Sequence, residues 1–124
     1  MRVFKTKWFS KFARKNHIAD ATLVTIAKGL DEGKWDADLG LDVYKVRIAR
    51  PNAGKGSGFR TIILYRKGER AFFEYGFPKS ERDDIEDFEL WNFRDEAANV
   101  LNMPEDVLEA QIEGGSFIEL NLEG

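Results

Sequence analysis

The sequence predicts an α+β fold in which an antiparallel sheet packs against helices. Three β-rich segments follow one another in the middle of the chain, and glycine-containing connections join them as in consecutive antiparallel strands. Segments with helical apolar spacing precede and follow these strands. With 124 residues, 43% of them apolar, and no cysteine, the chain can bury a core without disulfides. We therefore expect one domain spanning residues 1–124.

The N-terminal part is expected to form a strand and two helices. Asp20 is a favourable N-cap for the second helix, and Gly29 is expected to end it. Residues 31–42 are predicted to form a loop. The predicted elements are a strand at Val3–Lys5, a helix within Trp8–His17 and a helix at Ala21–Lys28.

The remaining elements are three strands, two helices and an edge strand. Pro104 is typical of a helix start, and Gly114 of a helix end. The predicted strands are Val43–Ala49, Phe59–Arg66 and Ala71–Phe77, the predicted helices are Asp84–Leu101 and Glu105–Glu113, and the edge strand is Phe117–Leu122.

Positive charge is concentrated in the predicted sheet. From Lys45 to Arg82 there are ten Lys or Arg against three Glu, although the net charge of the chain is −3. Residues 83–124 carry thirteen acidic residues against one arginine. Such a local excess of positive charge favours a polyanionic ligand, and nucleic-acid phosphate is the commonest one.

Strand periodicity places the candidate ligand-binding cations. Alternate residues of a strand share a face, so Lys45 and Arg47 are expected on one open face while the apolar residues between them face the helices. Arg60 begins the second strand, and Lys79 and Arg82 follow the third. Antiparallel pairing would gather these cations on one surface.

Three sequence stretches resemble RelE/HigB-type toxins of type II toxin–antitoxin systems, within the RelE/ParE superfamily. They are YKVRIARP, GKGSGFRTI and YGFPKSER. The resemblance runs from Trp8 to about Leu101 and is dense over residues 40–85, with an acidic helical extension over residues 84–124. It implies a strand, two helices and three further strands, followed by one more C-terminal element, which matches the elements expected above.

The resemblance implies a ribonuclease that needs no metal or cofactor, and in which the RNA 2′-hydroxyl attacks the adjacent phosphate. Lys45 would then be the base, beside Arg47, and Arg60 would grip the scissile phosphate. Either Lys79 or Arg82 would act as the acid or as a second phosphate contact. Further expected RNA contacts are Arg50, Lys55 and Arg66.

One departure from the family concerns a tyrosine that some members carry further along the chain. The corresponding region here offers Phe88 or Trp91 for stacking, but no hydroxyl. The acidic residues of this region form either a solvated helix face or a surface that folds against the basic sheet and competes with RNA.

The resemblance implies an mRNA endonuclease that acts on the ribosome and is neutralised by a cognate antitoxin of the helix-turn-helix type. Operator DNA would be contacted through the antitoxin. Two alternatives stay open: a toxin of this fold with another target, such as DNA gyrase, and an inactive module that binds the antitoxin in repressor complexes. No secretory signal or membrane span is visible, so we expect a cytoplasmic protein without a membrane partner.

Overall fold

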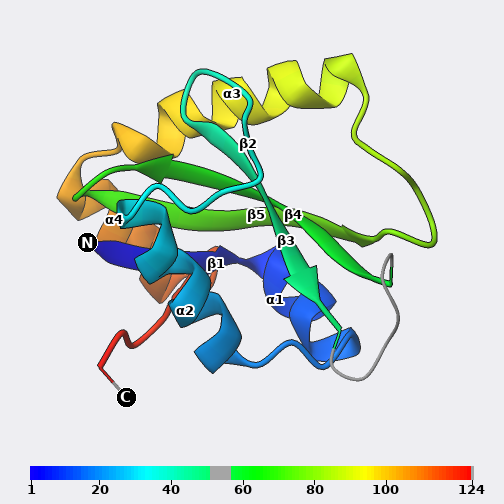
Figure 1. Cartoon of the computed structure of the whole chain (residues 1–124). Coiled ribbons are helices and arrows are strands. Elements are labelled where there is room, and N and C mark those ends of the chain that lie inside the picture. Colours follow the sequence, from blue (N-terminus) through cyan, green and yellow to red (C-terminus); the bar gives the residue numbers. More distant parts are fainter. Residues whose placement is uncertain (51–56, 124) are drawn as a thin grey trace.

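The computed structural model describes residues 1–50 and 57–123 (Figure 1). Lys55, one of the expected RNA contacts, lies outside the described residues. The prediction of an α+β fold is confirmed. The elements are β1 (Arg2–Thr6), α1 (Lys7–Lys15), α2 (Asp20–Asp31), β2 (Ala37–Asp38), β3 (Val43–Ala49), β4 (Gly58–Arg66), β5 (Arg70–Pro78), α3 (Asp87–Leu101), α4 (Glu105–Glu113) and β6 (Phe117–Glu119).

The described strands form one mixed sheet in the order β2-β3-β4-β5-β1-β6. The central strands β3, β4 and β5 pair antiparallel, as predicted. β1 pairs parallel with β5, and β6 pairs antiparallel with β1 at the edge of the sheet. The N-terminal strand and the C-terminal strand therefore lie side by side, far from β3.

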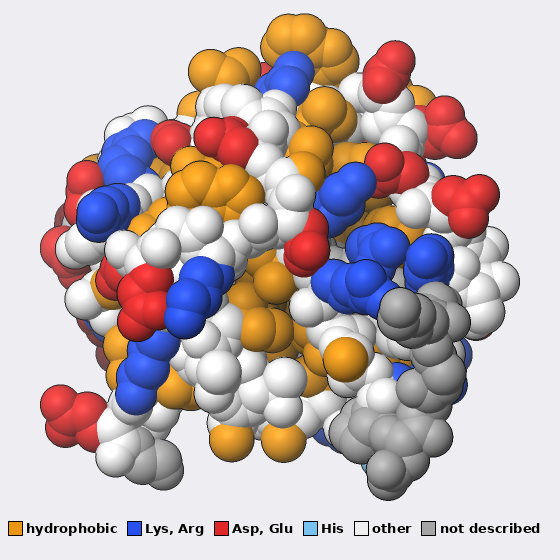
Figure 2. All heavy atoms as spheres, in the orientation of Figure 1, with side chains coloured by type: hydrophobic (Ala, Val, Ile, Leu, Met, Phe, Trp, Pro, Cys, Tyr) orange, Lys and Arg blue, Asp and Glu red, His pale blue; other side chains and the backbone are white. Residues whose placement is uncertain are grey.

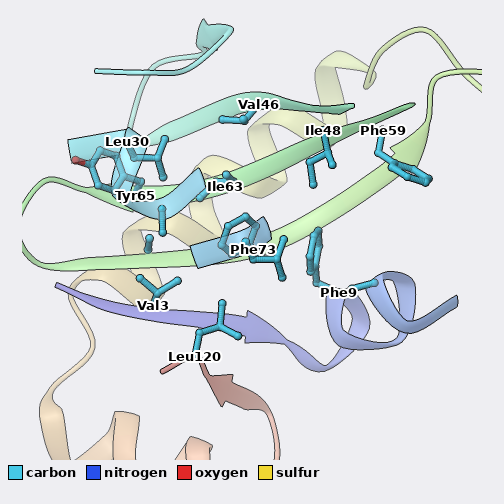
Figure 3. Packing of buried hydrophobic residues seen from close by; sticks show 14 of the residues in the cluster. Val3, Phe9, Leu30, Val46, Ile48, Phe59, Ile63, Tyr65, Phe73 and Leu120 are labelled. Carbon is cyan, nitrogen blue, oxygen red and sulfur yellow. The ribbon is translucent and has the colours of Figure 1, made fainter. Parts of the chain in front are cut away.

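Each face of the sheet buries its own apolar cluster. α1 and α2 cover one face, where Phe9, Leu23 and Leu30 pack against strand residues such as Val46 and Ile63 (Figures 1 and 3). α3 and α4 cover the other face. There the helical residues Ala97, Val100, Leu101 and Leu108 pack against Phe4, Val43, Ile62, Leu64 and Phe72.

Helices α3 and α4 are joined to the sheet by buried polar contacts as well. Arg70, at the start of β5, has only 8% of its surface exposed. Its guanidinium donates to the carbonyl oxygens of Val100, at 2.9 Å, and Met103, at 2.7 Å, and pairs with Glu105 at 3.0 Å. Part of the acidic C-terminal segment, residues 84–123, thus forms helices that cover the sheet.

None of the described helices combines the length and apolar character that a membrane span requires.

Three local predictions about the N-terminal half were wrong. Asp20 is not the N-cap of α2, because the helix begins at Asp20 and Ala19 is its N-cap. The Asp20 carboxylate accepts a hydrogen bond from Lys5 Nζ at 2.9 Å. Gly29 does not end α2, because the helix runs on and buries Leu30. The short strand β2, within the predicted loop, pairs with β3.

Glu74 sits at an irregularity in the central sheet. The β4–β5 register shifts between Ile62 and Ile63, which leaves Glu74 as an extra residue in β5. Its Oε2 atom is buried without a hydrogen-bond partner among the described residues. Burial, together with the charge of Glu96, raises the pKa of Glu74 to about 7.

This carboxyl group predicts a fold that loses stability as the pH rises. A carboxyl whose pKa is raised from 4.5 to about 7 on folding stabilises the fold most below pH 4.5, and this contribution is lost as the pH rises through 7. The loss is on the order of 3 kcal/mol. Urea unfolding at pH 5 and pH 8 should show it in the wild type, whereas Glu74→Gln should flatten the dependence. The same pH dependence in both proteins would refute this assignment.

Candidate functional site

The pairing of β3 with β4 brings two of the predicted cations directly opposite each other. Arg47 is the register partner of Arg60, and Lys45 is the partner of Ile62. Partners in a sheet share a face, and neighbouring strands lie roughly 4.8 Å apart. Lys45, Arg47 and Arg60 therefore form one cationic surface. We refer to these three residues with Arg82 as the cationic cluster.

β5 connects Arg82 to this surface. Phe77 is the register partner of Arg60, and the Arg82 guanidinium carbon lies 5.3 Å from the centre of the Phe77 ring. The row Arg47, Arg60 and Phe77 thus leads across three strands to Arg82. In Figure 2, blue side chains gather on the right of the view, with red Asp and Glu side chains beside them.

The face that carries Lys45 is only partly open, contrary to expectation. The side chain of Lys45 is only 19% exposed, whereas Arg47 is exposed. The reason is that α3 packs over the same face, with the segment that precedes it running beside β3. The Asp84 carboxylate of that segment accepts a hydrogen bond from Lys45 Nζ at 3.1 Å.

Asp84 is held as an anion inside the cationic cluster. Its partial burial disfavours the charge, but the backbone N–H of Ile85, the Lys45 ammonium and the charge of Arg60 outweigh this effect and lower the pKa of Asp84. The Nε atom of Arg82 also donates to the Asp84 backbone carbonyl, at 2.9 Å. A carboxylate of the same chain therefore lies among these cations.

Glu89, in the first turn of α3, pairs with the fourth cation. Arg82 donates two hydrogen bonds to this carboxylate, at 2.6 and 3.2 Å. The pKa of Glu89 is lowered chiefly by that contact. Together, Asp84 and Glu89 show that part of the acidic segment does fold against the basic sheet.

Of two other predicted residues, Lys79 lies close to the cluster, whereas Arg50 is directed toward the opposite face of the sheet. The backbone N–H of Lys79 donates to the carbonyl oxygen of Gly58 at 2.9 Å, which holds Lys79 beside the start of β4. Arg50 follows β3, and its guanidinium carbon lies 4.9 Å from the ring centre of Phe59. Phe59 belongs to the core cluster of the α1 and α2 side. Arg50 is therefore directed toward that side of the sheet.

Arg66 is not brought to the cluster. It ends β4, six residues beyond Arg60, which corresponds to roughly 20 Å along a strand. Its guanidinium pairs with Asp42 at 3.1 Å and donates to Asn102 at 2.9 Å. These contacts join β4 to the loop before β3 and to the end of α3.

Tyr75 supplies a hydroxyl that was not among the site residues predicted from the sequence. It is the register partner of Ile62, and its hydroxyl accepts a hydrogen bond from Arg82 at 3.2 Å. Its ring lies 4.7 Å from that of Trp8 and 5.7 Å from that of Phe93. The alternation within YGFP could have indicated that Tyr75 shares a face with Phe77, but not that Arg82 folds back onto it.

The arrangement of the cations suits an anionic ligand. Within the described part of the chain, no group of three or more Asp, Glu or His side chains is placed to hold a metal ion. Guanidinium groups bind phosphate oxygens in a two-pronged geometry, and Arg47 and Arg60 are suitably adjacent for this. Fold and site together define a small α+β protein with a cationic surface at one end of its central strands.

The chain belongs to the RelE toxin family. The family model described as "RelE toxin of RelE / RelB toxin-antitoxin system" matches residues 1–120. The match extends beyond the range of about 8–101 suggested by the sequence motifs and includes β1, α4 and β6. None of the curated proteins matches the chain. The protein is therefore a toxin of the RelE type, and this class implies an antitoxin partner.

Proposed function

We propose that this protein is an endoribonuclease that cuts mRNA on the ribosome and is neutralised by a cognate antitoxin. The observation that carries the proposal is the opposed pair Arg47 and Arg60 with Lys45 on the same face. Family membership supports the assignment to a toxin–antitoxin system. We also propose that residues 1–124 act as one domain, in the cytoplasm, with operator DNA contacted only through a helix-turn-helix antitoxin.

The proposed reaction is a transfer within the RNA. The 2′-oxygen forms a bond to the adjacent phosphorus and the bond from phosphorus to the 5′-oxygen breaks. A base takes the 2′-hydroxyl proton, and an acid gives a proton to the leaving 5′-oxygen. Arg47 and Arg60 would hold the phosphate and stabilise the charge that develops on its oxygens.

Lys45 is the proposed base, acting after RNA has displaced Asp84. In the free protein Lys45 Nζ is paired with the Asp84 carboxylate at 3.1 Å. Arg82, with the Tyr75 hydroxyl beside it, is better placed than Lys79 to serve as the acid or as a second phosphate contact.

Replacing Asp84 with asparagine tests the competition between the acidic segment and RNA. The change removes a negative charge from the cluster while nearly keeping the shape of the side chain. We expect RNA affinity and cleavage rate to rise about 3- to 5-fold, as for loss of a partly exposed ion pair. Single-turnover cleavage measures both quantities. A fall in rate would instead make Asp84 the base.

Induction in cells tests the function itself. Mapping of mRNA 5′ ends should reveal new ends at codons within translated frames, and these ends should vanish in the double variant Lys45→Ala/Arg60→Ala. Growth arrest with intact mRNA would contradict the proposal and indicate another target, such as DNA gyrase.

An inactive module that binds its antitoxin is the second candidate function. The specific observation in its favour is that Lys45 and Arg82 are both neutralised by acidic residues of the same chain. In that case neither the wild type nor Asp84→Asn would cut mRNA, while the protein would still change operator binding by the antitoxin.

A further inference from the structure

A pocket of about 380 Å³ lies between α1 and the end of β5, next to the cationic cluster. Aromatic rings and cations line it together. The rings come from both elements, and the positive charge comes from α1 and from Arg82, which follows β5. The lining includes Trp8, Lys11, Lys15, Tyr75, Phe77 and Arg82.

The α1 wall follows from helical periodicity. Trp8, Lys11, Phe12 and Lys15 are spaced three and four residues apart, so they share one face of the helix. Lys11 and Lys15 are exposed, and Trp8 leaves 47% of its surface in solvent. The Trp8 ring stacks on Phe12, with centroids 5.5 Å apart and an angle of 12° between the rings. The indole is thus fixed in orientation and still accessible.

The floor of the pocket depends on a residue without a side chain. A Cβ atom at Gly76 would lie 2.5 Å from the Phe12 ring. The absence of that atom lets Phe12 pack directly on the β5 backbone. Trp8, resting on Phe12, is thereby brought to 4.7 Å from Tyr75.

The pocket and the cationic cluster share a wall. Tyr75, Phe77 and Arg82 line the pocket, and the Tyr75 hydroxyl and the Phe77 ring both contact Arg82. Phe77 is also the register partner of Arg60. A ligand whose phosphate lay at Arg60 would therefore have the pocket directly beside it.

We propose that this pocket binds a base of single-stranded RNA, next to the phosphate held by Arg47 and Arg60. The proposal rests on the ribonuclease function proposed above. Any base offers a flat face for stacking on Trp8, and Lys11 and Lys15 stand at the rim, where the RNA backbone would pass. The only acidic side chain that lines the pocket among the described residues is the exposed Glu81, against three cations. This charge balance favours RNA over an acidic peptide.

Binding of a labelled single-stranded RNA oligonucleotide to Trp8→Ala tests the proposal. Stacking on one aromatic side chain predicts about a 5- to 150-fold loss of affinity. Trp35→Ala is the matched control, because Trp35 is 37% exposed, lies between α2 and β2, and does not line the pocket. Trp8→Phe should recover part of the affinity, and circular dichroism checks that each variant is folded.

An abasic oligonucleotide of the same length separates the pocket from the phosphate site. Trp8→Ala should not change its binding, whereas Arg60→Ala should weaken binding of both oligonucleotides. If only the Arg60 variant had an effect, the ribonuclease site would stand and the pocket proposal would fall. If neither variant had an effect, both proposals would fall. If Trp8→Ala reduced antitoxin binding and left RNA binding intact, the pocket would be a protein contact and the proposal would be overturned.

Discussion

Arg60→Ala is expected to lower the rate of RNA cleavage by about 10²- to 10³-fold, the usual effect of removing one group that stabilises transition-state charge. Arg60 lies between Arg47 on β3 and Phe77 on β5, at the centre of the cationic cluster. Because Arg60 is only half-buried, we expect its loss to change the free energy of unfolding by less than about 1 kcal/mol. Single-turnover cleavage of ribosome-bound mRNA measures the first effect, and urea unfolding the second.

Lys67→Ala is the control for the loss of one positive charge. Lys67 is exposed in the turn between β4 and β5, at the far end of the strand from Arg60. Its replacement should leave the cleavage rate within about 2-fold of the wild type, because exposed charges at that distance are screened. Equal losses in both variants would mean that overall charge, rather than the Arg60 position, governs the activity.

Phe9→Ala is expected to have the largest effect on stability. Phe9 is fully buried under the sheet, and its ring lies 5.4 Å from that of Phe73 and 5.5 Å from that of Phe12 (Figure 3). Truncation of a buried Phe costs about 3–5 kcal/mol through lost transfer energy and the cavity that remains. Urea unfolding should show a much lower midpoint with a similar slope.

Lys7→Ala, at an exposed position of the same helix, should stay within about 0.5 kcal/mol of the wild type. If Phe9→Ala lost less than about 1 kcal/mol, α1 would not be packed on the sheet as described. The pocket wall formed by Trp8 and Phe12 would then lose its support.

Periodicity predicted the central strands because each of them alternates between two buried faces within a bounded segment. Val43–Ala49 was predicted to the residue. The predicted strand Phe59–Arg66 is one residue short at its start, and Ala71–Phe77 is one residue short at each end. The short strand Ala37–Asp38 could not be predicted, because two residues are too few to show an alternating pattern. These residues form a strand through their pairing with β3. The end of α2 was misplaced because burial of Leu30 outweighs the cost of Gly29 inside a helix.

The cations of the candidate site could be listed from the sequence, but their partners could not. Alternation placed Lys45 and Arg47 on one face, and the family resemblance indicated Arg60. The contacts of Asp84 with Lys45, and of Arg82 with Tyr75, depend on the path of the segment between β5 and α3. No local pattern encodes that path. The β-bulge that displaces Glu74 likewise arises from strand pairing and has no sequence signature here.

The acidic residues serve two kinds of contact. Glu105, Glu109 and Glu119 pair with Arg2 and thereby join α4 and β6 to the N-terminal strand. Asp84 and Glu89 instead pair with members of the cationic cluster. The low net charge of the chain thus results partly from acids that stabilise the fold and partly from acids that occupy the candidate site.

The most direct test of the account uses mRNA with a single 2′-deoxynucleotide on the 5′ side of the scissile bond. The purified protein is added to ribosomes that carry this mRNA or its all-ribose counterpart, and the cut ends are mapped. Attack by the 2′-hydroxyl predicts cleavage of the all-ribose mRNA with a 5′-hydroxyl on the downstream product, and no cleavage at the deoxy position. Cleavage at the deoxy position would contradict attack by the 2′-hydroxyl and, with it, the proposed role of the cationic cluster.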